Sequence, residues 1–493
     1  MNRYRCISIF TAIAVICAAW TSVHAEERRF GVCGDTTVCE NYAVSYLTFS
    51  VKPGWSIGAG SEQCRMNIIG VNILGGRAAK LRGIEASIGG NVQCVDAAGI
   101  QAAGIGNIVA GPMAGIQAAG IGNVVGGQSR GLQIAGFGNV AAGHHSGAQV
   151  SAFGNVAAEG GRGLQVAAFG NVVDGDNIGA QISAFGNVVS KHMRGAQIAI
   201  FGNVAAEGAT GIQTAMFGNV SVESGHALQV AMFGNVAADG ARAVQFANFG
   251  NVHVGAPARL QVAMFGNVAG DLRGLQVGVM NRVVDTSEAI GDLVGKDTES
   301  VDTGTMSGAQ IGIYNRADVA KGLQLGIVNR AKQHSGVPVG VVSIVDNVPF
   351  RWGLEASETG IVTAEMRSGT QTFRSFLVIG ASPIEDPFVF STGFGFGPRM
   401  YLESVPAFFD FNLMSHRVVE DFDWGSPHMV NSARVRLGWR IGPSVAVTAA
   451  ASLNLLVSER NDGSHLVPTT LRAWDSGDWH YRVWPGVSIG VEF

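Results

Sequence analysis

The amino-acid sequence predicts an all-β protein, in which a solenoid-like rod of β repeats is followed by a C-terminal antiparallel β-barrel. Three observations support this fold class. A sixteen-residue pattern recurs through the middle of the chain. Glycine is abundant, at 70 of 493 residues, whereas charged residues make up only 14%. From about residue 351, apolar and polar residues alternate in the way that is typical of half-buried strands.

The first 25 residues have the pattern of a cleaved secretory signal peptide. Arg3 and Arg5 precede an apolar run at 7–20, and a small-residue cleavage pattern ends at Ala25. The apolar run is too short for a membrane anchor. We therefore expect an exported chain whose mature part begins near residue 26.

Four cysteines remain after this cleavage, in or near a predicted N-terminal cap segment at 26–65. An even number of cysteines in an exported chain favours disulfides. We prefer the pairs Cys33–Cys39 and Cys64–Cys94, although the sequence alone permits three connectivities. A metal site is the weaker interpretation, because no histidine lies near these cysteines at ligand spacing.

The repeat, predicted for residues 66–346, is marked by glutamine and, six residues later, by asparagine. Eleven glutamines stand at an unbroken spacing of sixteen from Gln101 to Gln261, and Glu85 occupies the position one step earlier. Compact units, in which asparagine follows after five residues, begin at Gln276, Gln310 and Gln324. An acidic, Gly- and Thr-rich insert at 285–306 is expected to form a surface loop.

Two architectures fit this repeat. In a solenoid each unit is one coil, and identical residues stack in parallel rows. In a meander each unit is one antiparallel strand, and the repeats could then join the C-terminal strands in one large barrel. We favour the solenoid because a strict phase of Gln and Asn is useful only when identical amides lie opposite each other and hydrogen-bond from unit to unit.

The solenoid interpretation assigns structural roles to the repeated side chains. Glutamine and asparagine would form buried amide ladders, and phenylalanine would form a stacked row in the core. The residues that represent these ladders are Gln133, Gln149, Gln165, Asn139, Asn155, Asn171, Phe137, Phe153 and Phe169.

A separate C-terminal domain is predicted at 347–493. Val435 and Leu437 alternate with Arg434 and Arg436, so one face of this strand is apolar and the other is basic. Long and short connections alternate between seven or eight such strands, as in outer-membrane barrels. The inward Arg and Asp residues would then fill the interior of a small barrel.

The last strand of this domain is amphipathic and ends at the C-terminal Phe493. It resembles the last strand of bacterial outer-membrane barrels, in which the terminal phenylalanine is the assembly signal. That resemblance implies contact with outer-membrane lipid and with the barrel-assembly machinery.

The layout as a whole resembles a bacterial surface-repeat family of exported proteins with GxQxGxxN units. The matching stretches are MNIIGVNILGGRAAKLRGIEASIGGNV at 66–92, GAQIGIYNRA, GLQLGIVNRA and the tail that begins TFRSFLVIGASP. The resemblance implies an outer-membrane or cell-surface location, and it implies no particular biochemical activity for this chain. A weaker similarity to the curli major subunit supports amide ladders.

No catalytic, cofactor-binding or metal site is predicted. The GFGFG stretch at 393–397 lies inside an alternating strand and lacks the following helix of a nucleotide loop. A net charge of −4 without a basic stripe argues against nucleic acid as a partner. We expect a non-enzymatic envelope protein that is anchored in the outer membrane and has a structural or surface-binding role, with an unknown ligand if one exists. The alternative is an outer-membrane channel.

Overall fold

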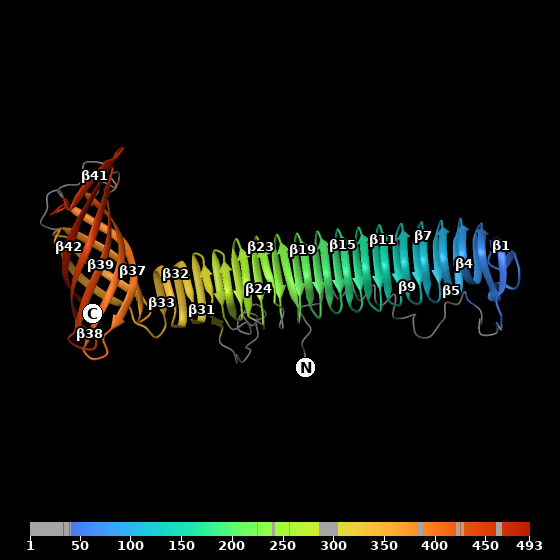
Figure 1. Cartoon of the computed structure of the whole chain (residues 1–493), viewed down its shortest axis with the longest axis horizontal. Coiled ribbons are helices and arrows are strands. Elements are labelled where there is room, and N and C mark those ends of the chain that lie inside the picture. The colour runs from blue at the N-terminus through green and yellow to red at the C-terminus, as the bar shows by residue number, and fades with distance from the viewer. Residues whose placement is uncertain are drawn as a thin grey trace. The chain divides into compact units, whose positions relative to one another are not determined.

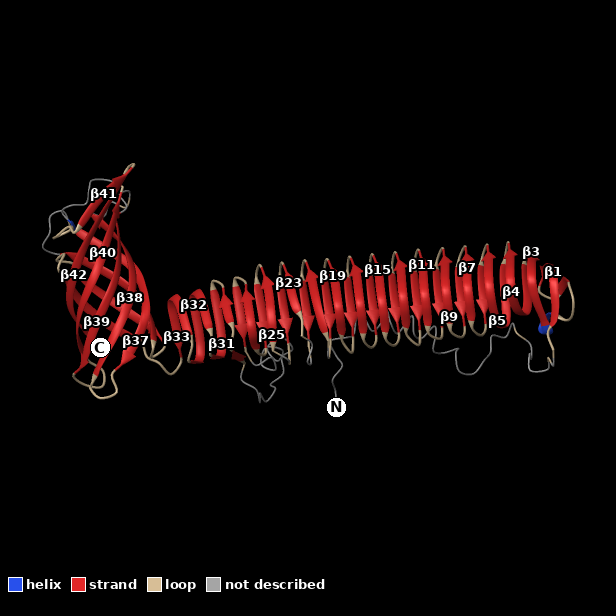
Figure 2. Cartoon of the chain, viewed as in Figure 1, coloured by secondary structure: helices blue, strands red, loops and turns tan. Residues whose placement is uncertain are grey.

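In the computed structural model, residues 33, 39, 41–223, 225–238, 242–255, 257–284, 304–382, 388–420, 424, 428–459 and 466–493 are described. The predicted signal peptide and most of the predicted insert at 285–306 lie outside them. The chain divides into two units, Met1–Ala256 and Pro257–Phe493. Strands make up most of the described residues, together with the short 3₁₀ turn η1 (Glu62–Cys64) (Figure 2).

The predicted fold class is confirmed: the chain forms a β-solenoid of about 16 turns and a closed antiparallel barrel of eight strands. The meander and the single large barrel are wrong, because the repeats pair in parallel. Gln149 lies opposite Gln133 on one side and Gln165 on the other. Each residue therefore lies opposite the equivalent residue of the neighbouring coil. Under this condition the strict spacing of Gln and Asn lets identical amides hydrogen-bond from coil to coil.

Unit Met1–Ala256 consists of solenoid coils whose strands lie side by side (Figure 1). Its first strands are β1 (Ala43–Lys52), β2 (Trp55–Ile57), β3 (Arg65–Asn72), β4 (Gly75–Ser87) and β5 (Gly90–Ala103). The longer strands of the later coils are β7 (Met113–Ala119), β9 (Ser129–Ala135), β11 (His145–Ser151), β13 (Gly161–Ala167), β15 (Asn177–Ser183), β17 (Met193–Ala199), β19 (Ala209–Ala215), β21 (His226–Ala231) and β23 (Val244–Ala247). The shorter strands are β6 (Gly106–Val109), β8 (Gly122–Val125), β10 (Gly138–Ala141), β12 (Gly154–Ala157), β14 (Gly170–Val173), β16 (Gly186–Val189), β18 (Gly202–Ala205), β20 (Gly218–Ser221), β22 (Gly234–Ala237) and β24 (Gly250–His253).

Parallel pairing begins earlier than the repeat pattern indicates. Strand β1 pairs in parallel with β3, so residues of the predicted cap segment at 26–65 already form a rung of the sheet. Strand β2 folds back antiparallel on β1. This hairpin occupies one side of the first rung, where an open edge would otherwise attract another strand.

The cysteine pairing predicted from the sequence is wrong. The structure joins Cys33 to Cys94 and Cys39 to Cys64. Cys94 lies in β5 and Cys64 ends η1, so both bonds tie the N-terminal segment to the first coils. The spacing of cysteines along the chain could not reveal this, because the partners are set by which coils stack.

Each coil encloses a thin interior that is filled by small apolar side chains and amides. In the coil of β11 and β12, Gln149, Asn155 and Ala157 are fully buried, while Val150 and Val156 point outward and are half-buried. Ala and Val dominate the apolar part of this thin layer, and larger buried side chains such as His145 occur at a few positions.

The amides form two continuous hydrogen-bonded rows. Gln149 Nε2 donates to Gln133 Oε1 at 2.8 Å, and Asn155 Nδ2 donates to Asn171 Oδ1 at 2.9 Å. Asn155 Nδ2 also donates to the carbonyl oxygen of Val166 at 2.8 Å. Buried amides are tolerated only when such partners are present, so the rows lock neighbouring coils in register.

Glu85 opens the glutamine row with a carboxyl group in place of an amide. Its side chain is fully buried and accepts hydrogen bonds from Asn72 Nδ2 at 3.0 Å and from Gln93 Nε2. Burial raises the pKa of this carboxyl, although the amide donors partly oppose the shift. The folded state therefore holds the Glu85 proton more tightly than the unfolded state does.

Stability should consequently depend on pH at this end of the solenoid. The contribution of Glu85 is fully present below its unfolded pKa and is lost as the pH rises through its raised folded pKa. We expect Glu85→Gln to remove this dependence. At pH 8 it should stabilise the folded state by on the order of 1 kcal/mol, which would be seen as slower amide exchange in β3–β5. Gln93 Oε1 has no hydrogen-bond partner and can accept from the new amide.

Hydrogen exchange of the full chain at pH 5 and pH 8 measures this effect. The reciprocal change Gln101→Glu, one coil further along the same row, should add a second loss of stability with rising pH, in the same direction as that of Glu85. Equal exchange of wild type and Glu85→Gln at both pH values would contradict the assignment.

Unit Pro257–Phe493 contains further solenoid coils and the barrel (Figure 1). The coil strands are β25 (Ala258–Ala263), β26 (Gly266–Ala269), β27 (Leu272–Val277), β28 (Met280–Val283), β29 (Thr305–Met306), β30 (Ala309–Ile311), β31 (Tyr314–Ala320), β32 (Leu323–His334) and β33 (Val337–Val345). The barrel strands are β34 (Arg351–Ser357), β35 (Val362–Gly369), β36 (Phe373–Ser382), β37 (Val389–Tyr401), β38 (Ala407–Glu420), β39 (His428–Arg440), β40 (Ala446–Ser458) and β42 (Trp479–Glu492), and β41 (Arg472–Ser476) pairs with β42. The barrel closes where β34 pairs antiparallel with β42.

Candidate functional site

The barrel wall has an apolar outside and a charged inside. On β39, Val435 and Leu437 point outward and are 46% and 42% exposed, whereas Arg434 and Arg436 are buried. This alternation follows directly from the two-residue period of a strand. The outer face of the wall therefore offers apolar side chains to its surroundings.

One half of the barrel interior is built around Arg399. Its guanidinium donates to Asp410 Oδ1 at 2.7 Å and to both oxygens of Glu492 at 2.7 Å. Arg436 donates to Asp410 Oδ2 at 2.7 Å and to Glu492 Oε2 at 2.5 Å. Two arginines thus share two carboxylates from strands β38 and β42.

The other half of the interior is built around Glu365. Arg367 Nε donates to Glu365 Oε2 at 2.8 Å, and Arg434 Nη2 donates to Glu365 Oε1 at 2.8 Å. Arg434 also reaches Glu355 Oε1 at 2.5 Å. Arg367 lies 3.5 Å from Asp410 Oδ2 and so joins the two halves.

We call these four arginines and four carboxylates the lumen network, and their formal charges cancel. Its members are Glu355, Glu365, Arg367, Arg399, Asp410, Arg434, Arg436 and Glu492. The alternation in the sequence predicted inward Arg and Asp residues, with Arg434 and Arg436 among them, but Glu355 and Glu365 were not predicted. The signal was present, because Glu365 stands two residues from Arg367 and therefore faces the same way.

Aromatic rings fill the space beside the network. The Arg367 guanidinium lies 4.3 Å from the ring centroid of Phe376, and Arg399 lies 3.9 Å from that of Phe408. A Cβ on Gly395 would lie 2.4 Å from Phe376 Cζ. Gly395 of the GFGFG stretch therefore makes room for a ring inside the barrel, and the phenylalanines of the stretch face outward.

Phe493 completes the last rung of the barrel. Its amide donates to the carbonyl oxygen of Trp352 at 2.8 Å, and its own carbonyl accepts from the amide of Trp352 at 2.9 Å. Its ring is 47% exposed. The terminal residue thus belongs to the seam where the first and last barrel strands meet.

The phenylalanines of the repeat stack, but they do not lie in the core. The rings of Phe137, Phe153 and Phe169 are nearly parallel, with centroids 4.6 and 4.8 Å apart. Phe137 is 58% exposed. The predicted burial is wrong because each ring lies in the turn between the two strands of a coil, where inward and outward positions cease to alternate.

In the described part of the chain, no three His, Cys, Asp or Glu side chains gather in a group that could hold a metal ion. Among the same residues, none forms a helix with the length and apolar character needed to cross a membrane.

In comparisons with known proteins, no family model, no curated protein and no solved structure matches the chain.

Proposed function

We propose that the protein is a non-enzymatic structural protein of the bacterial envelope, anchored in the outer membrane by its barrel. The observation that carries the proposal is a closed barrel of eight strands with apolar residues outside and a neutral ion-pair network inside. Lipid would contact the outer wall, and the barrel-assembly machinery would be a partner during insertion. The leader-like residues 1–25 support export.

The connections between barrel strands support one orientation. Short connections at 370–372, 402–406 and 441–445 lie at the same rim as the start of β34 and the end of β42. The longest connection, 459–478, lies at the opposite rim, together with the connections 358–361, 383–388 and 421–427. Outer-membrane barrels keep their short turns on the periplasmic side. The solenoid, which precedes β34, would then lie in the periplasm and act there as a scaffold.

Protease accessibility on intact cells tests this orientation. An epitope tag after Thr469, in the longest connection, should be cleaved from outside. A tag at Gly175, in a solenoid turn, should be cleaved only after the outer membrane is permeabilised. Cleavage of both tags on intact cells would place the solenoid outside and favour a surface-binding role.

Single-channel conductance separates the proposed function from the channel alternative. Purified protein in planar lipid bilayers should give no stepwise conductance, because charged and aromatic side chains occupy the interior of a barrel of this size. Arg440 lies on the same face of β39 as Arg434 and Arg436 but is exposed at the end of the strand, so Arg440→Ala should leave the silent bilayer unchanged. Regular conductance steps from the wild-type protein would favour transport instead.

A further inference from the structure

One edge of the coils in unit Pro257–Phe493 is apolar along its whole described length. The segments at this edge read AMFG, VGVM and IGIY, where two strands of a coil meet, and LGIV and VGVV within β32 and β33, and none of them contains a charged residue. We call this the apolar edge, and it is represented by Val277, Val279, Ile311, Ile313, Leu325 and Ile327. Ile313 and Ile327 are each 51% exposed.

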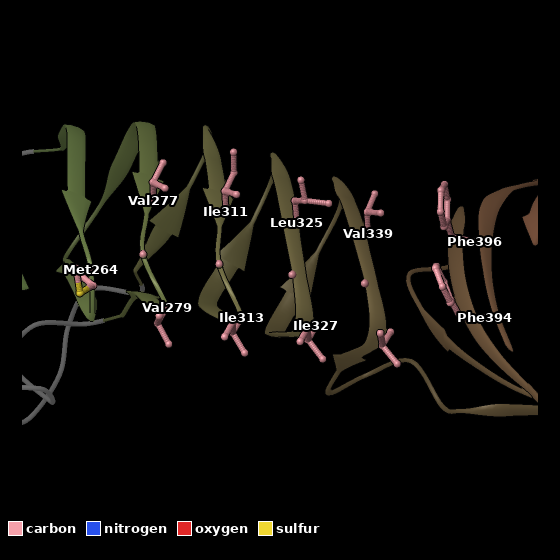
Figure 3. A pocket seen from close by; sticks show the side chains of 15 residues that line it. Met264, Val277, Val279, Ile311, Ile313, Leu325, Ile327, Val339, Phe394 and Phe396 are labelled. Atoms are coloured by element: carbon pink, nitrogen blue, oxygen red, sulfur yellow. The ribbon is translucent and has the colours of Figure 1, made fainter. Parts of the chain in front are cut away.

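The apolar edge continues onto the outer wall of the barrel. Phe394 and Phe396, on β37, line the same open groove as the last coils, and this groove has a volume of about 770 Å³ (Figure 3). Figure 3 shows the side chains of Val277, Ile311, Leu325 and Val339 in one row and those of Val279, Ile313 and Ile327 in a second. The coil edge and the barrel wall therefore form one apolar surface.

The last coil is fixed to the barrel near the rim of the short connections. The Ser343 amide donates to Ser368 Oγ at 3.0 Å, and Ser375 Oγ donates to the carbonyl oxygen of Pro338 at 3.3 Å. Ser375 is three residues beyond Thr372, which corresponds to about 10 Å along a strand at about 3.3 Å per residue. This is the depth scale at which interfacial segments rest in a bilayer.

Charged residues lie at the opposite edge of the same coils. There Lys332 Nζ pairs with Asp318 Oδ1 at 3.1 Å, and Lys321 is exposed. Each coil is thus amphipathic, with one apolar edge and one polar edge. An element with this distribution lies at a membrane surface with its apolar side toward lipid.

We propose that the apolar edge rests in the lipid leaflet that surrounds the barrel rim, so that the coils lie on the membrane. The proposal depends on the barrel being inserted as described above. A lipid leaflet is the occupant because the edge is continuous with the wall that lipid would cover. A second copy of the chain is the competing occupant.

The mature chain, reconstituted in vesicles of phosphatidylethanolamine and phosphatidylglycerol, allows a direct test. Single variants Ile313→Cys and Ile327→Cys place a nitroxide label on the apolar edge, and Ser335→Cys places one in an exposed turn at the polar edge. Cys33, Cys39, Cys64 and Cys94 form disulfides and do not react. Accessibility to oxygen and to a water-soluble nickel chelate is then measured by electron paramagnetic resonance.

We expect the ratio of oxygen to chelate accessibility to be about fivefold or more higher at 313 and 327 than at 335, because oxygen concentrates among acyl chains. Equal ratios in a protein that resists alkaline extraction would overturn this inference and leave the anchor intact. Strong spin–spin broadening at 313 would also overturn it, in favour of a second copy. Extraction of the protein by alkali would overturn both proposals.

Discussion

Asp410→Ala is expected to destabilise the barrel by about 3–5 kcal/mol, or to prevent its folding. Asp410 accepts hydrogen bonds from Arg399 through both of its oxygens and from Arg436 through Oδ2. Its removal leaves the buried Arg399 guanidinium with Glu492 as its carboxylate partner, and the buried Arg436 guanidinium with Glu492 and, at 3.9 Å, Glu365. An uncompensated buried charge costs far more than the loss of one hydrogen bond.

Urea unfolding of the full chain in detergent, together with the mobility shift of the heated protein on a gel, measures this loss. Asn412 offers a matched control, because it lies two residues further along β38, is buried on the same face and has no hydrogen-bond partner for its amide. We expect Asn412→Ala to change the unfolding free energy by about 1 kcal/mol or less. Similar losses of unfolding free energy in the two variants would mean that the lumen network contributes no more stability than another buried polar residue on the same face.

The solenoid could be predicted because its physics is local and repeated. A ladder of Gln133, Gln149 and Gln165 requires only that the coils stack in parallel and that each coil has the same number of residues. The sixteen-residue period in the sequence shows that number directly. Parallel stacking then follows from the need of buried amides for partners. No distant part of the chain has to be known.

The burial of Phe137 could not be predicted, because it depends on one backbone turn. Gln133 and Ala135 point inward by strand alternation, but the following turn resets the phase before Asn139. A shift of one residue moves a side chain to the other face of a sheet. The motif places Phe at a fixed point in the repeat without showing which side of the turn it occupies.

The sequence also could not predict which arginines pair with which carboxylates in the lumen network. Arg399 meets Glu492 across 93 residues, and the contact exists only once β42 has closed the barrel. Alternation predicts which residues point inward. The stagger of the strands decides which of them meet, and stagger is set by the whole barrel.

Gly163→Ala should produce the largest effect in the solenoid, because Gly163 has a positive φ of 124° and a close neighbour in the preceding coil. A Cβ at this position would lie 2.0 Å from the carbonyl oxygen of Gly147. Both the backbone conformation and the contact exclude a side chain. We expect a loss of about 2–3 kcal/mol, seen as faster amide exchange in β11 and β13.

Three natural departures from the pattern indicate how the coil would respond. The equivalent position is occupied by Ala227, Ala243 and Arg259, and the strands there, β21, β23 and β25, have six, four and six residues instead of the seven of β13. The expected response of Gly163→Ala is therefore a shortened β13 within an otherwise intact solenoid. Gly154→Ala is the control, because its Cβ would lie 3.1 Å from the carbonyl oxygen of Gly170 and its φ is not positive. If both variants exchange at the same rate, the coils yield freely at this contact, and the glycine row does not limit how closely they stack.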